Sequence, residues 1–303
     1  AVPEPVVTQA ASAPTYQVEG MAARAGASGG ALEPTGIMAA NTLATAAEAN
    51  VLAGFAKKVA YSVADTAANL VICTGLDRAV HIMAMTAATV AEAMIIEQAR
   101  NIGVKTYNIT DTAANLAASS SAVLSLAGVV TASTVATAAE AAVFAGFAKV
   151  VVYSVADMAA KLGASAGLNR AVNIIATTPA TLAEAAIIEA ARNSGVDTYT
   201  IADTAANLAT VTDGVLALAG QVTANTPASA VEADVLARFV MPVVYSVSDQ
   251  AAQVVASTGL RKAVNVEATT PATVAEAMVI AATGNRGRKI FDLEDTAAHL
   301  TGA

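Results

Sequence analysis

The feature that most constrains the fold of this chain is a hexapeptide that recurs at a fixed distance. It reads DTAANL at 65–70, and five further copies follow, each beginning 46 residues after the one before. A fixed period of roughly 20–50 residues is typical of proteins in which similar units stack in a row. The chain of 303 residues is therefore predicted to be a repeat array and not one or two ordinary domains.

A second motif lies between the hexapeptides and consists of Ser or Thr, any two residues, and Glu. Its copies begin with TAAE at 45–48 and are separated alternately by 44 and 48 residues, so the full period is 92 residues. This pattern is the capping box, in which the hydroxyl and the Glu side chain each accept a hydrogen bond from a backbone N–H at the start of a helix. Asp, which opens the hexapeptide, is also a strong N-cap residue. The predicted helix-capping residues are Asp65, Asp111, Asp157, Asp203, Asp249 and Asp295, and Glu48, Glu92, Glu140, Glu184, Glu232 and Glu276.

A strand is predicted before each cap. The strands of the first type, such as VAYSVAD at 59–65, alternate large and small residues and end at the aspartate. Strands of the second type, such as AVHIMAM at 79–85, precede the capping boxes. An aromatic residue lies four positions before each aspartate, and these residues are predicted to form a buried spine: Tyr61, Tyr107, Tyr153, Tyr199, Tyr245 and Phe291. The alternative is that the tyrosines form a stacking platform for sugars or bases.

The predicted fold is an α/β solenoid of 46-residue β-α-β-α repeats with parallel strands and a 92-residue super-repeat. The face of the strands that carries Tyr and Val is expected to pack against the helices, which leaves a small polar face open. The alternative is a 46-residue coil in which the two strand types form separate sheets. The array is predicted to span 14–303, and residues 1–13, which include Pro3 and Pro5, are predicted to form an extended tail.

Composition excludes several classes of protein. The chain is 55% hydrophobic but only 4% aromatic, and its net charge of −8 argues against a nucleic-acid partner, which would need basic stripes. The sequence has no convincing apolar run of about 18 residues, so no membrane span is predicted. The only cysteine, Cys73, lies in an apolar run and is expected to be buried. The start at AVPEP, without Met, is interpreted as an excised segment or as a terminus left after removal of a signal peptide.

No residue pattern predicts catalysis or metal binding. A column of the six aspartates could bind calcium, but the clustered oxygen pattern of calcium loops is absent. The glutamates recur in every copy, whereas a catalytic residue should be singular. The two histidines, His81 and His299, are far apart in the sequence. We therefore predict that the chain is not an enzyme and that it has no catalytic, cofactor-binding or metal-binding residues and no cofactor.

The DTAANL hexapeptide and the ATVAEA pattern resemble the Ala/Thr-rich tandem repeats of large secreted bacterial surface proteins, of the surface-layer and giant-adhesin kind. The resemblance covers nearly the whole chain from residue 14. It implies an extracellular or cell-surface location and a structural or adhesive role. It supplies no catalytic residues.

The function predicted first is that of an extracellular structural protein that assembles with itself, end to end, into a filament, layer or matrix. Opposite charges at the two ends would orient head-to-tail contact, and these predicted assembly residues are Arg286, Arg288 and Lys289 at one end and Glu4, Glu19 and Glu33 at the other. The alternative is a surface binding module, similar to an adhesin, that recognises a repetitive ligand such as polysaccharide through its open polar face.

Overall fold

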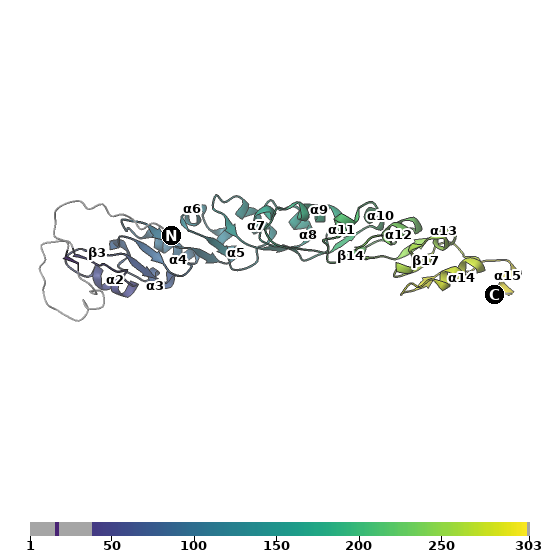
Figure 1. The fold of residues 1–303 in the computed structure, drawn as a ribbon, viewed down its shortest axis with the longest axis horizontal. Coiled ribbons are helices and arrows are strands. Elements are labelled where there is room, and N and C mark those ends of the chain that lie inside the picture. Colours follow the sequence, from purple (N-terminus) through teal and green to yellow (C-terminus); the bar gives the residue numbers. More distant parts are fainter. Residues whose placement is uncertain (1–15, 18–37, 302–303) are drawn as a thin grey trace. The chain divides into compact units, whose positions relative to one another are not determined.

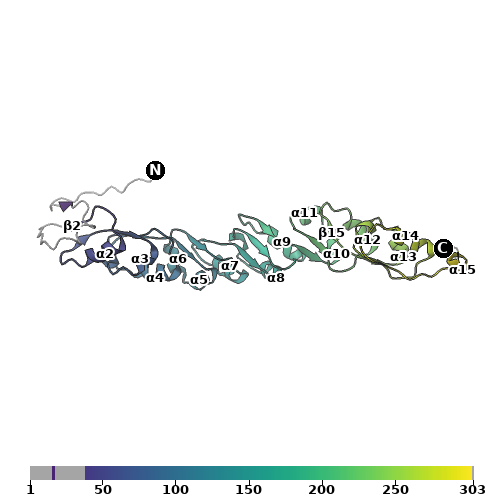
Figure 2. The same cartoon turned by 90° about the horizontal axis from the view of Figure 1, so that it is seen from below.

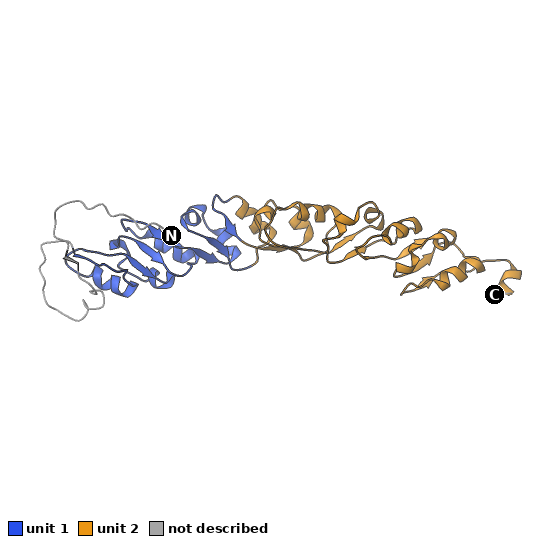
Figure 3. Cartoon of the chain, viewed as in Figure 1, with its two compact units in different colours: residues 1–134, 147–152 blue, residues 135–146, 153–303 orange. Residues whose placement is uncertain are grey.

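The computed structural model describes residues 16–17 and 38–301 (Figure 1). It confirms a mixed α/β fold in which parallel three-stranded sheets alternate with short helices. The chain forms two compact units, of which the first ends at Thr134 but also takes in Phe147–Val152 (Figure 3). The second consists of Val135–Gly146 and the residues from Tyr153 onward. The predicted tail, residues 1–13, lies outside the described residues.

The first unit contains three parallel sheets and the helices that connect their strands. The sheets are β1 (Tyr16–Gln17), β2 (Met38–Ala39) and β3 (Val59–Ala60); β4 (Val63–Asp65), β5 (Ile82–Ala84) and β6 (Lys105–Thr106); and β7 (Ile109–Asp111), β8 (Val130–Ala132) and β9 (Val151–Val152). The helices are α2 (Ala46–Ala53), α3 (Ala67–Val71), the 3-10 helix η1 (Leu76–Arg78), α4 (Val90–Gln98), α5 (Ala113–Ala118) and α6 (Ser121–Leu126).

The second unit repeats this plan. Its sheets are β10 (Val155–Asp157), β11 (Ile174–Ala176) and β12 (Asp197–Thr198); β13 (Ile201–Asp203), β14 (Val222–Ala224) and β15 (Val243–Val244); and β16 (Val247–Asp249), β17 (Val266–Ala268) and β18 (Lys289–Ile290). Its helices are α7 (Ala138–Ala145), α8 (Ala159–Gly163), η2 (Leu168–Arg170), α9 (Leu182–Ala190), α10 (Ala205–Leu208), α11 (Asp213–Leu216), α12 (Ala230–Leu236), α13 (Ala251–Ala256), η3 (Gly259–Lys262), α14 (Val274–Ala282) and α15 (Ala297–Thr301). Within this unit α12, α13 and α14 follow one another in both views (Figures 1 and 2).

The two strand types alternate within each sheet. Strand β4, of the first type, pairs with β5, of the second, and β5 pairs with β6, which begins the next strand of the first type. Each pairing is parallel and joins residues about one β-α step apart, as in Val63 opposite Ile82. The alternative with separate sheets for the two strand types is therefore wrong.

The strand predicted at 59–65 is divided into β3 and β4, which belong to different sheets. The cause lies in its neighbour, where Ala39 pairs with Ala60 and Ala44 pairs with Val63. The five steps from Ala39 to Ala44 therefore lie opposite only three steps, from Ala60 to Val63. The extra residues form a bulge in the strand of the second type, and the bulge interrupts the regular pairing. The bulge recurs in every repeat, and in the next copy it contains Thr86, whose hydroxyl reaches a helix.

The core lies between the inner face of the strands and the helices. Val63, Ile82 and Leu70 are fully buried, and Cys73 is buried as predicted. Alanines such as Ala49 occupy the buried side of the helices, and small side chains allow backbones to approach closely. The approach is close at Gly75, where an added Cβ would lie 2.5 Å from the carbonyl oxygen of Ala49.

Candidate functional site

The six aspartates end the strands of the first type, but none of the described helices uses them as its N-cap. Thr66 is the N-cap of α3, and its hydroxyl accepts from the N–H of Asn69. Asp65 lies one residue earlier. Its Oδ1 accepts from the N–H of Thr66 at 2.7 Å and from the side-chain amide of Asn69, and its Oδ2 accepts from the N–H of Ala46 at 2.9 Å. The predicted N-cap role is therefore wrong in detail, because Asp65 bridges the first turns of two helices.

The same bridge recurs along the chain. The Oδ2 atoms of Asp111, Asp157, Asp203, Asp249 and Asp295 accept from the first helical N–H of α4, α7, α9, α12 and α14, respectively. Threonines of the bulges cap the helices that follow the aspartates. Thr86 Oγ1, for example, accepts from the N–H of Ala67 at the start of α3, at 3.0 Å. An Asp at the end of a strand lies on the same face as Val63, which is the face that packs against helices. That placement directs its carboxylate to the helix of the preceding step.

At Asp65 and Asp295, these hydrogen bonds favour the ionised form of the carboxylate. The N–H of Ala46 is the largest cause that lowers the pKa of Asp65, followed by the side-chain amide of Asn69. The N–H of Val274 and the ring of His299 lower the pKa of Asp295 to about 2. Amides that point at a carboxylate favour its charged form. Such groups are suited to capping helices and poorly suited to donating a proton.

The glutamates close capping boxes in the described helices. The N–H of Thr45 donates to Glu48 Oε2 at 2.8 Å, and the N–H of Glu48 donates to Thr45 Oγ1 at 3.3 Å. Both halves of the box are present at α2, α4, α7, α9, α12 and α14, where the glutamates are Glu48, Glu92, Glu140, Glu184, Glu232 and Glu276. Each carboxylate is therefore engaged at the start of its own helix.

The tyrosines lie inside the array, and their rings are not available to a ligand. Tyr61, Tyr107, Tyr153, Tyr199 and Tyr245 are each only 2% exposed. Tyr153 donates its hydroxyl to the carbonyl of Gly167 at 2.5 Å, whereas Tyr199 donates to the carboxylate of Glu189. Phe291 departs from the predicted spine, because it is only half-buried. The described residues after Phe291 contain the β-bridge of Leu293 and helix α15, and they include no further repeat that would cover Phe291.

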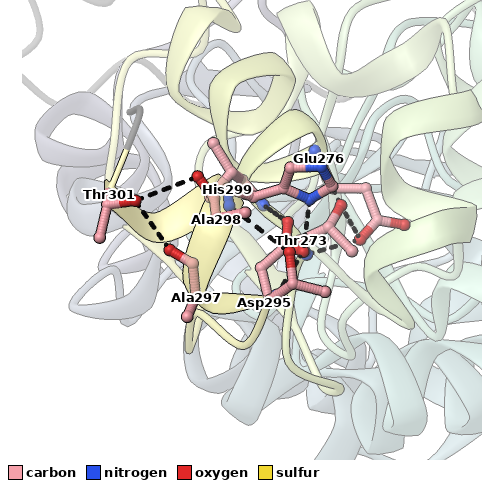
Figure 4. Close-up of polar contacts among 9 residues, drawn as sticks. Thr273, Glu276, Asp295, Ala297, Ala298, His299 and Thr301 are labelled. Carbon is pink, nitrogen blue, oxygen red and sulfur yellow. Dashed lines mark hydrogen bonds and ion pairs between the residues drawn. The ribbon is translucent and has the colours of Figure 1, made fainter.

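The terminal repeat shows the capping network with one substitution (Figure 4). His299 takes the place of the hexapeptide asparagine, and its Nδ1 lies 2.8 Å from Asp295 Oδ1. The other oxygen, Oδ2, accepts from the N–H of Val274 at 3.0 Å. His81, the other histidine, accepts at Nδ1 from the N–H of Val104, as Asn173 does for Val196. Both histidines therefore have structural partners.

The predicted assembly cations do not form one patch. Arg286 is exposed in the loop before β18. Lys289 donates its ammonium to the carbonyl oxygen of Ala281 at 2.7 Å, near the end of α14. Arg288 instead borders the open face of the last sheet. Arg288 and Lys289 separate because successive residues of an extended segment point to opposite faces. The predicted acidic partners Glu4, Glu19 and Glu33 lie outside the described residues.

The open face of the sheets is less polar than the sequence pattern indicated. The outward residues of one row in register are Ala64, Met83 and Thr106, and those of another are Ala156, Ile175 and Thr198. An exposed aliphatic side chain occurs in each of the five sheets from β4 to β18, namely Met83, Val152, Ile175, Val244 and Ile290. The predicted polar face is thus interrupted, because the period-two pattern identifies the outward positions but not the polarity of each residue.

One hollow on this face departs from the repeat. It has a volume of about 420 Å³ on the sheet of β16, β17 and β18, and its lining includes Ser246, Ser248, Asn265, Glu267 and Arg288. Sequence reasoning singled out Arg288 as an end charge but did not select Glu267 or Ser248. The missed signal was the 92-residue alignment, in which Glu267 follows Met83 and Ile175 at the same position.

The described residues contain no group of three or more His, Cys, Asp or Glu side chains that could hold a metal ion. Within the same residues, no helix combines the length and the apolar character that are needed to cross a membrane. The chain matches no model of a known protein family, no curated protein and no solved structure.

Proposed function

We propose that this chain is an extracellular structural repeat protein that assembles with itself, end to end, into a filament, layer or matrix. The observation that carries the proposal is the apolar surface of the last described repeat. Leu293 is 49% exposed and Leu300 is 44% exposed, although the equivalent residues of earlier repeats, such as Val247 and Leu208, are at most 1% exposed. The side chains that form the core elsewhere are thus presented on the surface here.

At this end, the described residues also lack a hydrogen-bond partner that the next repeat supplies elsewhere. In the first unit, the N–H of Ala67 at the start of α3 is capped by Thr86 of the following bulge. Ala297 holds the same position in α15, and the described residues include no such threonine for its N–H. The strand edge beyond Leu293 is unpaired among the described residues, and exposed strand edges favour pairing with another chain.

A second copy of the same chain suits this surface, because another β-α repeat supplies a parallel strand, a capping side chain and an apolar cover together. Such a contact joins different surfaces of the two copies. It is heterologous and generates an open filament unless the rotation closes a ring. The resemblance of the repeats to those of secreted surface proteins supports an extracellular location for the assembly.

The test compares assembly at rising concentration by light scattering. Wild type is expected to grow in mass, and the double variant Leu293→Asp, Leu300→Asp is expected to remain monomeric, because two charges would be buried without partners. Leu218→Asp is the matched control, since Leu218 is also exposed but follows the end of α11 and does not belong to the terminal repeat. Circular dichroism checks that every variant stays folded.

Two results would overturn the proposal. One is a wild type that stays monomeric at high concentration, and the other is a double variant that assembles as well as the control.

A second function, the binding of a repetitive ligand such as polysaccharide to the open face, is supported by the hollow at β16, β17 and β18.

A further inference from the structure

Residues that break an otherwise regular array are the best candidates for specific recognition. On the open face, the position of Met83 and Ile175 is taken by Glu267 in the last sheet. The position of Val104 and Val196, also 92 residues apart, is taken by Arg288. Two aliphatic positions of the repeat have thus become an anion and a cation in a single sheet. Packing does not explain the change, because both side chains are exposed.

These residues lie together in space. Ser248 pairs in register with Glu267, and its hydroxyl lies 3.4 Å from Glu267 Oε2. Arg288 directly precedes β18, and its carbonyl oxygen accepts from the N–H of Val266 at 2.9 Å. Ser246 and Asn265 complete the polar lining, with Ser246 Oγ 3.3 Å from the side-chain nitrogen of Asn265.

The two charges do not neutralise each other. The ion pairs among the described residues are Lys105 with Glu97, Lys161 with Asp157, and His299 with Asp295. Neither Glu267 nor Arg288 takes part in them, although both line the same hollow. A guanidinium and a carboxylate that are both open to solvent can each pair with a ligand, and the hydroxyls between them offer further hydrogen bonds.

The lining also includes apolar residues that can contact the apolar part of a ligand. Pro227 and Ile290 line the same hollow, and Ile290 is half exposed. A sugar ring presents both C–H groups and hydroxyls, which fits a hollow that is lined by aliphatic and by polar side chains. The guanidinium of Arg288 adds a preference for a carboxylate, which it can bind through two parallel hydrogen bonds.

We propose that this hollow binds an acidic sugar, a hexuronate unit of a polysaccharide. Arg288 binds the sugar carboxylate, Glu267 and Ser248 bind ring hydroxyls, and Ile290 and Pro227 contact the ring. The site does not depend on end-to-end assembly, because it lies on the open face and not on the terminal surface of Leu293 and Leu300.

The experiment titrates the full chain, at a concentration where it is monomeric, with an oligomer of galacturonic acid, and measures binding by calorimetry. A glucose oligomer of the same length is the neutral probe. Arg288→Val and Glu267→Ile restore the residues of earlier repeats, so the fold should be retained. Each is expected to weaken binding about tenfold or more, because a charge-assisted hydrogen bond is lost. Arg238→Gln, at an exposed cation outside the hollow, should leave affinity unchanged.

Three outcomes would overturn the site. The wild type could fail to bind the galacturonic oligomer at millimolar concentration, the glucose oligomer could bind as tightly, or the two repeat-restoring variants could bind as well as wild type. Binding of a simple amino acid in place of both oligomers would reassign the hollow to a zwitterion and also reject the proposal. Light scattering on the same variants separates this result from the assembly proposal, since both variants should assemble like wild type.

Discussion

At the scale of the residue, the aspartates do more than cap one helix. Asp157 Oδ1 accepts from the N–H of Met158 at 2.8 Å, and Oδ2 accepts from the N–H of Ala138 at 3.2 Å. Lys161 lies 3.3 Å from the same carboxylate. Because Met158 replaces the usual threonine, α8 has no side-chain cap of its own. One carboxylate therefore serves the starts of two helices.

The first prediction concerns Asp157→Ala. The pKa of Asp157 is lowered, and the largest cause is the hydrogen bond from the N–H of Met158. Burial raises this pKa in part, and the hydrogen bond from the N–H of Ala138 lowers it further. At neutral pH the variant should lose about 0.5–2 kcal/mol of unfolding free energy, as for the loss of a cap. A carboxyl whose folded pKa is lowered stabilises the fold above its unfolded pKa and loses that contribution as the pH falls.

The difference in unfolding free energy between wild type and variant should therefore shrink as the pH drops below 3.8, the ordinary pKa of aspartate. Denaturant unfolding at several pH values measures it. Asp292→Ala is the control, because Asp292 is exposed and its side chain makes no hydrogen bond among the described residues. A loss of stability that is the same at pH 7 and well below 3.8, or one that the control shares, would contradict the capping account.

At the scale of the element, helix packing depends on glycine at one position of each super-repeat. An added Cβ at Gly167 would lie 2.2 Å from the carbonyl oxygen of Ala141 in α7, and at Gly259 the same atom would lie 2.4 Å from that of Ala233. The backbone of both glycines also accepts the hydroxyl of a buried tyrosine, as Gly167 does from Tyr153. Close approach, and not backbone conformation, requires glycine here.

The second prediction follows from this contact. Gly167→Ala should destabilise the fold by about 1–3 kcal/mol, because backbone atoms must move apart to admit the methyl group. Gly214→Ala is the matched control, since nothing lies within 4 Å of its added Cβ and it falls inside α11. Its helix propensity should stabilise by about 0.5–1 kcal/mol. Thermal unfolding measures both changes. If the two variants shift the melting temperature in the same direction relative to wild type, the argument is refuted.

At the scale of the whole molecule, stability is expected to be local. Each repeat of an array contacts mainly its neighbours, so its stability is close to a sum of repeat and interface contributions. Leu208 of α10 is fully buried, and it belongs to the second of the two compact units. A cavity at this position weakens the packing of its own repeat and of the repeats beside it.

The third prediction is that Leu208→Ala loses about 2–5 kcal/mol locally and speeds amide hydrogen exchange in β13, β14 and β15. Amides of β5, in the first unit, should keep their wild-type rates. Val240→Ala, at a side chain that is 86% exposed, should change no rate. Equal acceleration throughout both units would show that the chain unfolds as one cooperative body.

The sequence by itself determined the parts of this protein that depend on short-range patterns. The period of 46 residues, the alternation of strand and helix, and the capping boxes such as Thr45 with Glu48 all follow from residues a few positions apart. Such patterns are reliable here because they recur in every repeat. The burial of Tyr61 follows from the alternation along its strand, and the burial of Cys73 follows from the apolar run that contains it.

Only the tertiary structure decided which groups meet across the repeats. It assigned Asp65 to the N–H of Ala46, placed β3 and β4 in different sheets, and brought Ser248, Glu267 and Arg288 into one hollow. These contacts depend on strand register and on the bulge that shifts it. A shift by one residue moves every side chain to the opposite face, so the partners are set only when the strands pair.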